Sequence, residues 1–463
     1  MKEINKISNI YFAGIGGIGM SALARYFNAN GVKVSGYDKT ETVLTKKLQQ
    51  EGIAIHFTDD ILLLDKNADV VVYTPAIPAT HKEFNFYKEN NYTLLKRSDV
   101  LGLLTKDTFN ICVAGTHGKT TTSAMVAHIL KATGYGCNAF LGGIAANYDT
   151  NFWGSETKVS VAEADEYDRS FLKLSPDIAI ITSMDADHLD IYGTEKNMQD
   201  AFIDFSNKIK ESGCLIIKYG LQRSEDFTTK NICTYSVTDK NANLHIDNLK
   251  IENGAYCFDV VNTNWEIKNV LLNMGGIHNI ENVIASIAVA KYLKIDDDEI
   301  KAAVASFKGV KRRFEYVIKA AKEGLVFIDD YAHHPEELRA LINGAKNLFP
   351  TKKCTVVFQP HLFSRTKDLA DGFAEVLSLA HETILLPIYP ARELPMQGVT
   401  SQIVYDKITN ADKKIIAKED VVKHFEKYSD KYKAEDTLLI TAGAGDIDTL
   451  VEPLKEIFTN IGH

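Results

Sequence analysis

The chain has 463 residues, too many for one hydrophobic core of ordinary size, and domains of roughly 100 to 200 residues predict about three of them. Hydrophobic residues make up 45% and charged residues 24%, a composition that excludes a disordered or low-complexity chain. A formal net charge of −9 argues against general binding to nucleic acid or to an anionic membrane, although a local basic pocket could still bind phosphates.

Six cysteines are scattered along the chain without a C-x-x-C spacing, so neither a zinc site nor a disulfide framework is supported. The N-terminal segment has no uninterrupted apolar stretch, and no apolar run approaches the roughly 18 residues of a membrane span. We therefore expect reduced thiols and a cytoplasmic protein with no nucleic-acid or membrane partner.

Short apolar runs alternate with longer amphipathic stretches, which is the pattern of βαβ units, and the pattern restarts after each of two breaks. In the first part we expect strands at residues 10–13, 32–35 and 70–73. In the second part we expect strands at 109–114, 159–162 and 178–181, short strands with Asn-rich turns over 213–275, and helices at 279–293 and 297–307. A basic linker at 309–314 then leads to strands at 326–328, 356–358, 384–386 and 438–440. The pattern predicts an α/β fold with domains at residues 1–106, 107–312 and 313–463.

The strongest single motif is the segment at residues 115–122, Gly-Thr-His-Gly-Lys-Thr-Thr-Thr, which follows a predicted strand and opens an Ala-rich helix. Backbone N–H groups in such a turn, together with the helix N-terminus, attract phosphate. Lys119 would then reach the terminal phosphates, and the Thr120 hydroxyl is placed to bind Mg²⁺. Val113 stands where the G-x-x-x-x-G-K-[ST] pattern has its first glycine, so this is a shortened variant that begins at Gly115. The motif indicates ATP binding.

Residues 14–19, Gly-Ile-Gly-Gly-Ile-Gly, follow the first predicted strand and satisfy G-x-G-x-x-G, and Asp38 stands about 20 residues further on. This pattern indicates a nucleotide diphosphate. By itself it favours a dinucleotide redox cofactor, and a tight turn at a strand end is the other interpretation. The ATP motif downstream competes with the redox interpretation.

Two acidic clusters, residues 163–166 and 185–190, each follow a predicted strand and should lie at the strand ends beside the ATP motif, where α/β sheets bind ligands. Their carboxylates suit Mg²⁺, whereas the imidazole of His188 is a less usual ligand for this ion. Solvated loops are the alternative interpretation of both clusters.

In the third part, residues 329–335 and 358–366 again place polar groups directly after strands. His333 and His334 are either functional or residues that cap a helix and face solvent. Arg365, near His361, is a candidate contact for an anion, with a solvated helix start as the alternative.

Taken together, these motifs resemble the Mur ligases of bacterial cell-wall synthesis, and most closely the branch that attaches L-alanine. The resemblance covers nearly the whole chain. Its blocks, in order, are residues 14–20, 74–78, 115–122, 163–166, 187–190, 276–282, 312–315, 330–335 and 358–361.

The resemblance implies a three-domain fold with Rossmann-like first and third domains and a central P-loop ATPase-like domain whose sheet is mostly parallel. The first domain would hold the UDP-sugar, the second ATP and Mg²⁺, and the third the amino acid. It implies an ATP-dependent ligase that joins L-alanine to the lactyl carboxylate of UDP-N-acetylmuramate through an acyl phosphate, in peptidoglycan synthesis. We expect a monomer or weak homodimer.

The resemblance also assigns site residues. The UDP-sugar would contact Gly14, Gly16, Gly17, Gly19, Asp38, Thr74 and Ala76. ATP would contact Gly115, Thr116, His117, Gly118, Lys119, Thr120, Thr121, His278, Asn279, Asn282 and Arg312. The metal ligands would be Thr120, Glu163 and His188. The candidate catalytic residues are Lys119, His188, His333, Tyr331 and Arg365, of which His333 or Tyr331 would handle the amine proton.

The chain departs from the family at two places. Leu362 stands where many relatives have an arginine, so one cation near the substrate is missing. Residues 201–205 lack the lysine that becomes carbamylated in other Mur ligases, an absence shared by the alanine-adding branch.

Four other functions were weighed. A ligase that joins a recycled tripeptide to the same sugar nucleotide shares the order of the motifs and is the main alternative. A folylpolyglutamate synthetase shares only the central domain. An NAD-dependent dehydrogenase or an unreactive nucleotide sensor leaves the motifs of the third domain unexplained.

Overall fold

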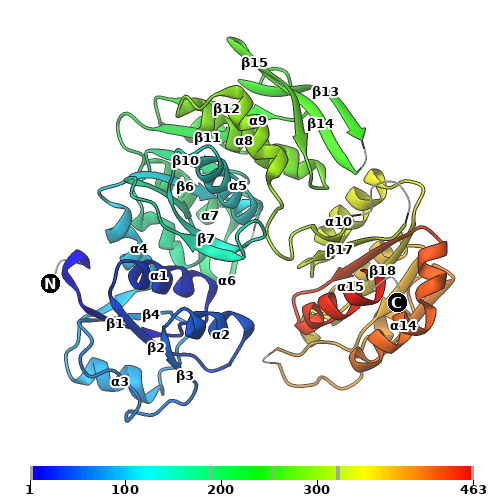
Figure 1. The fold of residues 1–463 in the computed structure, drawn as a ribbon, viewed down its shortest axis with the longest axis horizontal. Coiled ribbons are helices and arrows are strands. Elements are labelled where there is room, and N and C mark those ends of the chain that lie inside the picture. Colours follow the sequence, from blue (N-terminus) through cyan, green and yellow to red (C-terminus); the bar gives the residue numbers. More distant parts are fainter. Residues whose placement is uncertain (1–3, 187–188, 253, 320–323, 392, 460–463) are drawn as a thin grey trace. The chain divides into compact units, whose positions relative to one another are not determined.

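The fold was analysed in a computed structural model, which describes the chain except residues 1–3, 187–188, 253, 320–323, 392 and 460–463 (Figure 1). The chain divides into two compact units. The first unit comprises Met1–Ile246, Val260–Ile267 and Glu281–Val304, and the second comprises Asp247–Asp259, Lys268–Ile280 and Ala305–His463.

The N-terminal part of the first unit is a parallel sheet of five strands in the order β3-β2-β1-β4-β5. Its strands are β1 (Asn9–Ala13), β2 (Lys33–Tyr37), β3 (Ala54–His56), β4 (Val70–Tyr73) and β5 (Leu94–Lys96), and its helices are α1 (Ile18–Ala29), α2 (Val43–Gln50), α3 (Lys82–Glu89) and α4 (Arg97–Thr105). The strand order changes direction between β1 and β4. A doubly wound sheet binds ligands in the crevice at such a switch point.

The central sheet has ten strands in the order β15-β14-β13-β12-β11-β10-β6-β9-β7-β8. They are β6 (Phe109–Ala114), β7 (Asn138–Ala145), β8 (Thr150–Trp153), β9 (Val159–Glu163), β10 (Ile178–Ile181), β11 (Cys214–Lys218), β12 (Ile232–Ser236), β13 (Leu244–Glu252), β14 (Ala255–Asn262) and β15 (Trp265–Leu272). The accompanying helices are α5 (Lys119–Ala132), α6 (Leu189–Tyr192), α7 (Glu195–Ser206), α8 (Ile277–Tyr292) and α9 (Asp297–Ser306). Strand β6 is buried from Asn110 to Ala114 and runs parallel to β9 on one side and β10 on the other, so a second switch point lies at its carboxyl end.

The prediction of short strands over residues 213–275 was wrong for its second half. Strands β13, β14 and β15 have nine, eight and eight residues. Many positions of β13 and β15 are exposed and polar, so the apolar runs by which strands are recognised are interrupted there.

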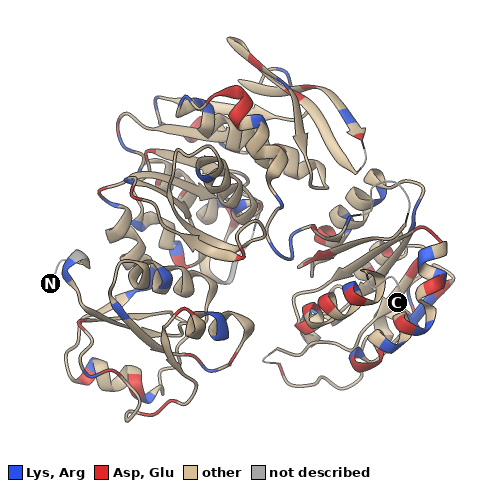
Figure 2. Ribbon diagram, viewed as in Figure 1, with Lys and Arg blue, Asp and Glu red and all other residues tan. Residues whose placement is uncertain are grey.

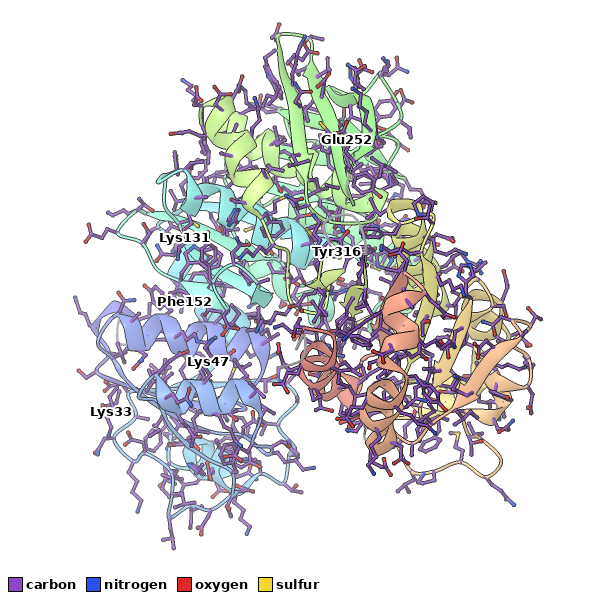
Figure 3. The ribbon with its side chains drawn as sticks, turned by 45° about the vertical axis from the view of Figure 1, so that its right-hand side comes forward. Lys33, Lys47, Lys131, Phe152, Glu252 and Tyr316 are labelled. Carbon is purple, nitrogen blue, oxygen red and sulfur yellow. The ribbon has the colours of Figure 1, made fainter. Side chains whose placement is uncertain are left out.

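The two sheets of the first unit share one hydrophobic core, because α1 packs against the hairpin of β7 and β8. The ring of Tyr26 lies 5.6 Å from that of Phe140 and 5.9 Å from that of Phe152 (Figure 3). The buried Arg25 guanidinium, beside this cluster, donates to Glu51 at 2.8 Å and to Asn151 of β8. The glycine turns that follow β1 and β6 are therefore held in one rigid frame.

The second unit contains a six-stranded sheet in the order β16-β17-β21-β18-β19-β20, parallel except for β16. Its strands are β16 (Glu315–Ile318), β17 (Val326–Asp330), β18 (Lys353–Phe358), β19 (Glu382–Leu385), β20 (Asp412–Ile415) and β21 (Thr437–Ala442). Its helices are α10 (Pro335–Leu348), α11 (Phe363–Asp368), α12 (Ala370–Leu377), α13 (Gln402–Tyr405), α14 (Lys418–Ala434) and α15 (Val451–Thr459). Tyr316 of β16, labelled in Figure 3, donates its hydroxyl to the carbonyl oxygen of Gly254 at 3.0 Å.

Charges of both signs are mixed along α14, which presents no basic stripe (Figure 2). No helix in the described part of the chain is long and apolar enough to cross a membrane.

Candidate active site

The segment at residues 115–118 connects β6 to α5 and forms a cradle. Gly118, with φ at +81°, is the residue before α5, and a Cβ added there would lie 2.8 Å from Oδ1 of Asn282. Both observations require glycine. The first turn of α5 contains no acidic residue, and no side chain caps its N-terminus. The free N–H groups and the positive end of the helix dipole therefore favour an anion at this position.

The turn after β10 supports the cradle. The hydroxyls of Thr116 and Ser183 lie 2.8 Å apart, and the N–H of His117 donates to Ser183 Oγ at 2.9 Å. The hydroxyl of Thr182 donates to the carbonyl oxygen of Ala114 at 3.2 Å. The shape of the cradle therefore depends on a strand that lies far from it in the sequence.

Lys119, the first residue of α5, points back into the cradle. Its Nζ donates to the carbonyl oxygen of Gly115 at 2.6 Å and to Oε1 of the buried Glu166 at 2.8 Å. The cation that is expected to meet phosphate is thus already held at the cradle.

Thr120 and Glu163 bring together the hard oxygen atoms that Mg²⁺ prefers. The Thr120 hydroxyl lies 3.1 Å from Glu163 Oε1, and the other carboxylate oxygen accepts from the N–H of Gly142 at 3.1 Å. These donors fit a magnesium ion at the end of the cradle. His188, the third predicted ligand, lies outside the described residues.

Helix α8 places one of the three predicted adenine-binding residues at the cradle. Oδ1 of Asn282 accepts the hydroxyl of Thr122 at 3.0 Å, on the helix that follows the cradle. His278 and Asn279 belong to the second unit, where the Asn279 amide donates to the carbonyl oxygen of Gly275 at 2.6 Å and the His278 ring lies against Gly276.

The first glycine turn follows β1, at the switch point of the first sheet. The N–H of Gly14 donates to the carbonyl oxygen of Tyr37 at 2.8 Å. The N–H of Gly16 donates to Oδ2 of Asp38 at 2.7 Å, and Oδ1 of Asp38 accepts from Thr40 N–H at 3.2 Å. The Asp38 carboxylate therefore shapes the turn itself, whereas the sequence pattern suggests a direct ligand contact.

Helix α1 leaves this turn from Gly17, with no side-chain cap and no acidic residue in its first turn. Thr74, which follows β4, packs directly against Gly14, and its hydroxyl accepts from the N–H of Ala76 at 3.4 Å. The structure therefore brings the predicted residues 74–76 to the glycine turn.

Arg97 connects the first glycine turn with the acidic cluster after β9. Its guanidinium lies directly against Gly19 and donates to Oδ2 of Asp165 at 3.0 Å. Arg97, Asp165 and Glu163 line a small pocket together with Ser170. Arg97 therefore contacts both the first glycine turn and the acidic cluster that contains Glu163.

In the second unit, the turns after β17, β18 and β19 gather aromatic and basic groups. The ring of His333 lies 5.3 Å from that of Tyr331 and 6.1 Å from that of His361, and His361 stacks on Tyr389 at 5.7 Å. Nη1 of Arg365 lies 3.4 Å from Nδ1 of His361. The two motifs predicted from the sequence therefore form one cluster.

The protonation of His333 suits a base. Its Nδ1 lies 3.0 Å from the carbonyl oxygen of Tyr331, which can only accept, so Nδ1 carries the proton and Nε2 presents a lone pair. Burial lowers the pKa of His333, and Arg365 adds to this effect, so the ring is neutral at physiological pH. His334, by contrast, caps α10, in agreement with the capping interpretation for that residue.

Leu362, between His361 and α11, has φ at +70°, a value that strains a residue with a side chain. Strained backbone of this kind is concentrated at functional sites. The N–H of Leu362 donates to the carbonyl oxygen of Tyr389 at 2.9 Å, and the carbonyl oxygen of Leu362 accepts from the hydroxyl of Thr366 at 2.7 Å.

Arg312 lies at the other side of β17. Its guanidinium donates to the carbonyl oxygen of Gly443, lies 3.4 Å from the Asp448 carboxylate, and stacks on Tyr331 at 5.0 Å. Burial raises the pKa of the neighbouring Asp329 to about 7.

Three family models match the chain in sequence order. They are described as Mur ligase family, catalytic domain, at residues 9–108; Mur ligase middle domain, at residues 113–290; and Mur ligase, glutamate ligase domain, at residues 312–445. The chain belongs to the Mur ligase family. The family and the three-sheet α/β fold class inferred from the sequence motifs are confirmed.

Relatives of this Mur ligase match it over almost their whole length. UDP-N-acetylmuramate–L-alanine ligase of Flavobacterium johnsoniae is 49% identical, with 98% of this chain and 99% of the relative covered. The protein of the same name from Cytophaga hutchinsonii is 47% identical, with 98% and 97% covered. The crystal structure of UDP-N-acetylmuramate–alanine ligase from Thermotoga maritima superposes with a TM-score of 0.83 at 28% identity, covering 98% of this chain and all of that one. A murein peptide ligase from Psychrobacter arcticus has the same fold, with a TM-score of 0.66 at 23% identity over 98% of this chain and all of that one.

The sequence motifs did not identify several residues of the Mur ligase site. Arg97 had no assigned role, and Asp165 and Glu166 were part of an acidic cluster from which only Glu163 was selected. Thr182 and Ser183 follow a predicted strand directly, a signal that could have pointed to them. Nothing near Arg97 in the sequence marks it, since its partner Asp165 is 68 residues away.

Proposed function

We propose that this Mur ligase is an ATP-dependent UDP-N-acetylmuramate–L-alanine ligase, which forms an amide between L-alanine and the lactyl carboxylate of UDP-N-acetylmuramate in peptidoglycan synthesis. The observation that carries the proposal is identity of 44% to 49% over essentially the full length of relatives with that name. The phosphate cradle and the first glycine turn, held in one frame by a shared core, agree with a reaction that needs two nucleotides.

In this proposal the UDP-sugar binds at residues 14–19, with its pyrophosphate at the start of α1 and its sugar directed along Arg97. The lactyl carboxylate attacks the γ-phosphorus of ATP, which gives an acyl phosphate and ADP. The amine of L-alanine then attacks the acyl carbon, and phosphate leaves. Both steps concentrate negative charge, which Lys119 and the N-terminus of α5 offset.

Thr120 and Glu163 would hold Mg²⁺ in the proposed enzyme, with His188 as a further ligand. When bound, the ion supplies positive charge to the phosphate oxygens. The 3.1 Å approach of the Thr120 and Glu163 oxygens is the feature of this chain that fits the ion.

The second unit would supply the amino-acid site. His333 is the candidate base, because its neutral ring presents Nε2 and an ammonium group must lose a proton before it can attack an acyl carbon. Arg365 is the candidate contact for the carboxylate of L-alanine. Tyr331 stays the alternative candidate for the amine proton, and Arg312, His278 and Asn279 stay candidates for ATP.

The remaining assignments belong to the same proposal. The domains are residues 1–106 for the UDP-sugar, 107–312 for ATP and Mg²⁺, and 313–463 for the amino acid. The enzyme works in the cytoplasm as a monomer or weak homodimer.

The test measures ADP release with UDP-N-acetylmuramate and a panel of acceptor amines. Release should depend on L-alanine, and Lys119→Ala should abolish it. Lys131→Ala is a matched control, because Lys131 lies in the last turn of the same helix and its ammonium stacks on Tyr148 at 4.4 Å, away from the cradle (Figure 3). Near-normal release by Lys119→Ala would disprove the assignment of the cradle.

The second candidate is a ligase that joins a recycled tripeptide to the same sugar nucleotide, as the name of the structural neighbour from Psychrobacter arcticus indicates for that protein. The same assay decides between the two. Release that depends on the tripeptide Ala-Glu-diaminopimelate and not on L-alanine would favour this alternative.

A further inference from the structure

Glu166 has no role in the mechanism described above, yet its carboxylate lies inside the nucleotide cradle. Its side chain is 1% exposed, and its Oε1 lies 2.8 Å from Nζ of Lys119, whose side chain is 15% exposed. The same ammonium donates to the carbonyl oxygen of Gly115 at 2.6 Å. A lysine ammonium has three N–H donors, and these two short contacts direct two of them. The third donor has only a long contact, 3.5 Å from the carbonyl oxygen of Thr116, which is at the limit of a hydrogen bond.

The backbone around Glu166 is held rigidly. The two residues Asp168 and Arg169 have φ at +52° and +60°, and the N–H of Arg169 donates to the carbonyl oxygen of Glu166 at 2.9 Å. The hydroxyl of the buried Tyr192 donates to the same oxygen. The strained turn and its hydrogen bonds therefore fix where the Glu166 carboxylate lies.

A fixed carboxylate reduces the entropy that the Lys119 side chain loses when it binds a phosphate. The lysine side chain has four rotatable bonds and about 2 kcal/mol of rotamer entropy, which is lost when the ammonium is held against a phosphate. Glu166 and the Gly115 carbonyl make the side chain lose this freedom before the nucleotide binds. Pre-organised groups of this kind contribute to catalysis because a misplacement of about 1 Å can cost about 100-fold in rate.

We propose that Glu166 is a positioning residue for Lys119, which it holds so that the third N–H donor is directed at the terminal phosphates of ATP. The inference rests on the proposed ATP-dependent ligase function. It attributes the influence of Glu166 on ATP binding to its hydrogen bond with the Lys119 ammonium and to the geometry of that bond. The opposing idea is that Glu166 acts only through its negative charge, as a counter-ion.

Two conservative variants separate these ideas. Glu166→Gln keeps an acceptor at the same reach and removes the charge, whereas Glu166→Asp keeps the charge and withdraws the carboxylate by one methylene group. Positioning predicts that Glu166→Gln retains kcat/KM for ATP within about threefold, while Glu166→Asp loses about 10- to 100-fold. The KM for UDP-N-acetylmuramate should change less than twofold in either variant, because the first glycine turn is not altered.

Asp177→Asn is the matched control. Asp177, directly before β10, is another carboxylate paired with a lysine, Lys210 at 2.7 Å, but it accepts from the N–H of Asn110 at the amino end of β6. It should change the melting temperature and leave the kinetics for ATP unchanged. Thermal unfolding of every variant shows that each is folded under the assay conditions.

Calorimetric titration with a non-hydrolysable ATP analogue keeps this test separate from that of the ligase function, because it needs neither the sugar nucleotide nor L-alanine. Binding of the analogue should weaken about tenfold in Glu166→Asp and little in Glu166→Gln. A counter-ion role would give the reverse order, with Glu166→Gln the weaker variant. That order, or wild-type values for both variants, would overturn the proposal.

Discussion

Replacing Asp38 with alanine should weaken binding of the sugar nucleotide, because this carboxylate holds the first glycine turn in place. It accepts from the N–H of Gly16 at 2.7 Å and from that of Thr40 at 3.2 Å. A hydrogen bond to a charged group contributes about 1.5 to 3 kcal/mol. If the loss of the shorter bond alone disorders the turn, the KM for UDP-N-acetylmuramate should rise about 10- to 150-fold.

Asp38→Asn should fall between the wild type and Asp38→Ala, because an amide oxygen can still accept from Gly16 N–H without the charge. We expect a rise in KM of about three- to tenfold for this variant. The KM for ATP should not change in either variant, since the cradle after β6 is built independently of Asp38.

The measurement is the initial rate of ADP release while each substrate is varied in turn. Asp65→Asn is the matched control, because Asp65, like Asp38, is an acidic residue of the first domain that accepts from a nearby backbone N–H. Asp65 pairs at 3.3 Å with Lys33, which is labelled in Figure 3. An unchanged KM for the sugar nucleotide in Asp38→Ala, or equal rises in the KM of both substrates, would refute the reasoning.

Three further predictions concern the cradle and the second unit. Gly118→Ala should raise the KM for ATP about tenfold. The φ of +81° at this position costs a residue with a Cβ about 1 to 2 kcal/mol, and the added atom meets Asn282. An unchanged KM for ATP would contradict this prediction. Thr120→Val should raise the Mg²⁺ concentration for half-maximal activity about tenfold or more, and Thr120→Ser should keep the wild-type value. Equal metal dependence of all three proteins would exclude the hydroxyl as a ligand. Asp329→Asn should reduce the loss of stability between pH 4 and pH 8. Burial raises the pKa of Asp329 to about 7, so the stability that its proton contributes is fully present below its ordinary pKa and is lost as the pH rises through about 7, by up to about 4 kcal/mol. Melting temperatures of both proteins across this range provide the test, and parallel curves would contradict the prediction.

Much of the secondary structure could be read from local pattern. The strands at residues 109–114, 178–181 and 70–73 are found at those bounds, because each is a short, mostly buried and mostly apolar run. The expected strand at 326–328 is the start of the longer β17, and the expected strand at 438–440 lies inside the longer β21. Strands β13 to β15 were underestimated, since strands with one polar face show weaker apolar periodicity.

The candidate site could be predicted only where its residues are consecutive. The cradle is one local turn, so its glycines, Lys119 and Thr120 are recognisable together. The ion pair of Lys119 with Glu166 joins residues 47 positions apart, and the bond from Arg25 to Asn151 joins residues 126 apart. Such pairs depend on which strands become neighbours, and local spacing carries no information about that.

The sequence by itself determined that this protein has two glycine turns after strands and a cradle lysine, the pattern on which the proposal of two nucleotide sites rests. Backbone conformation at a glycine turn is a local property, which explains why it can be read residue by residue. Tertiary structure decided what surrounds these turns. Parallel pairing of β6 with β9 and β10 brings Glu163, Glu166 and Thr182 to the cradle, and the shared core of the first unit holds both turns in one frame.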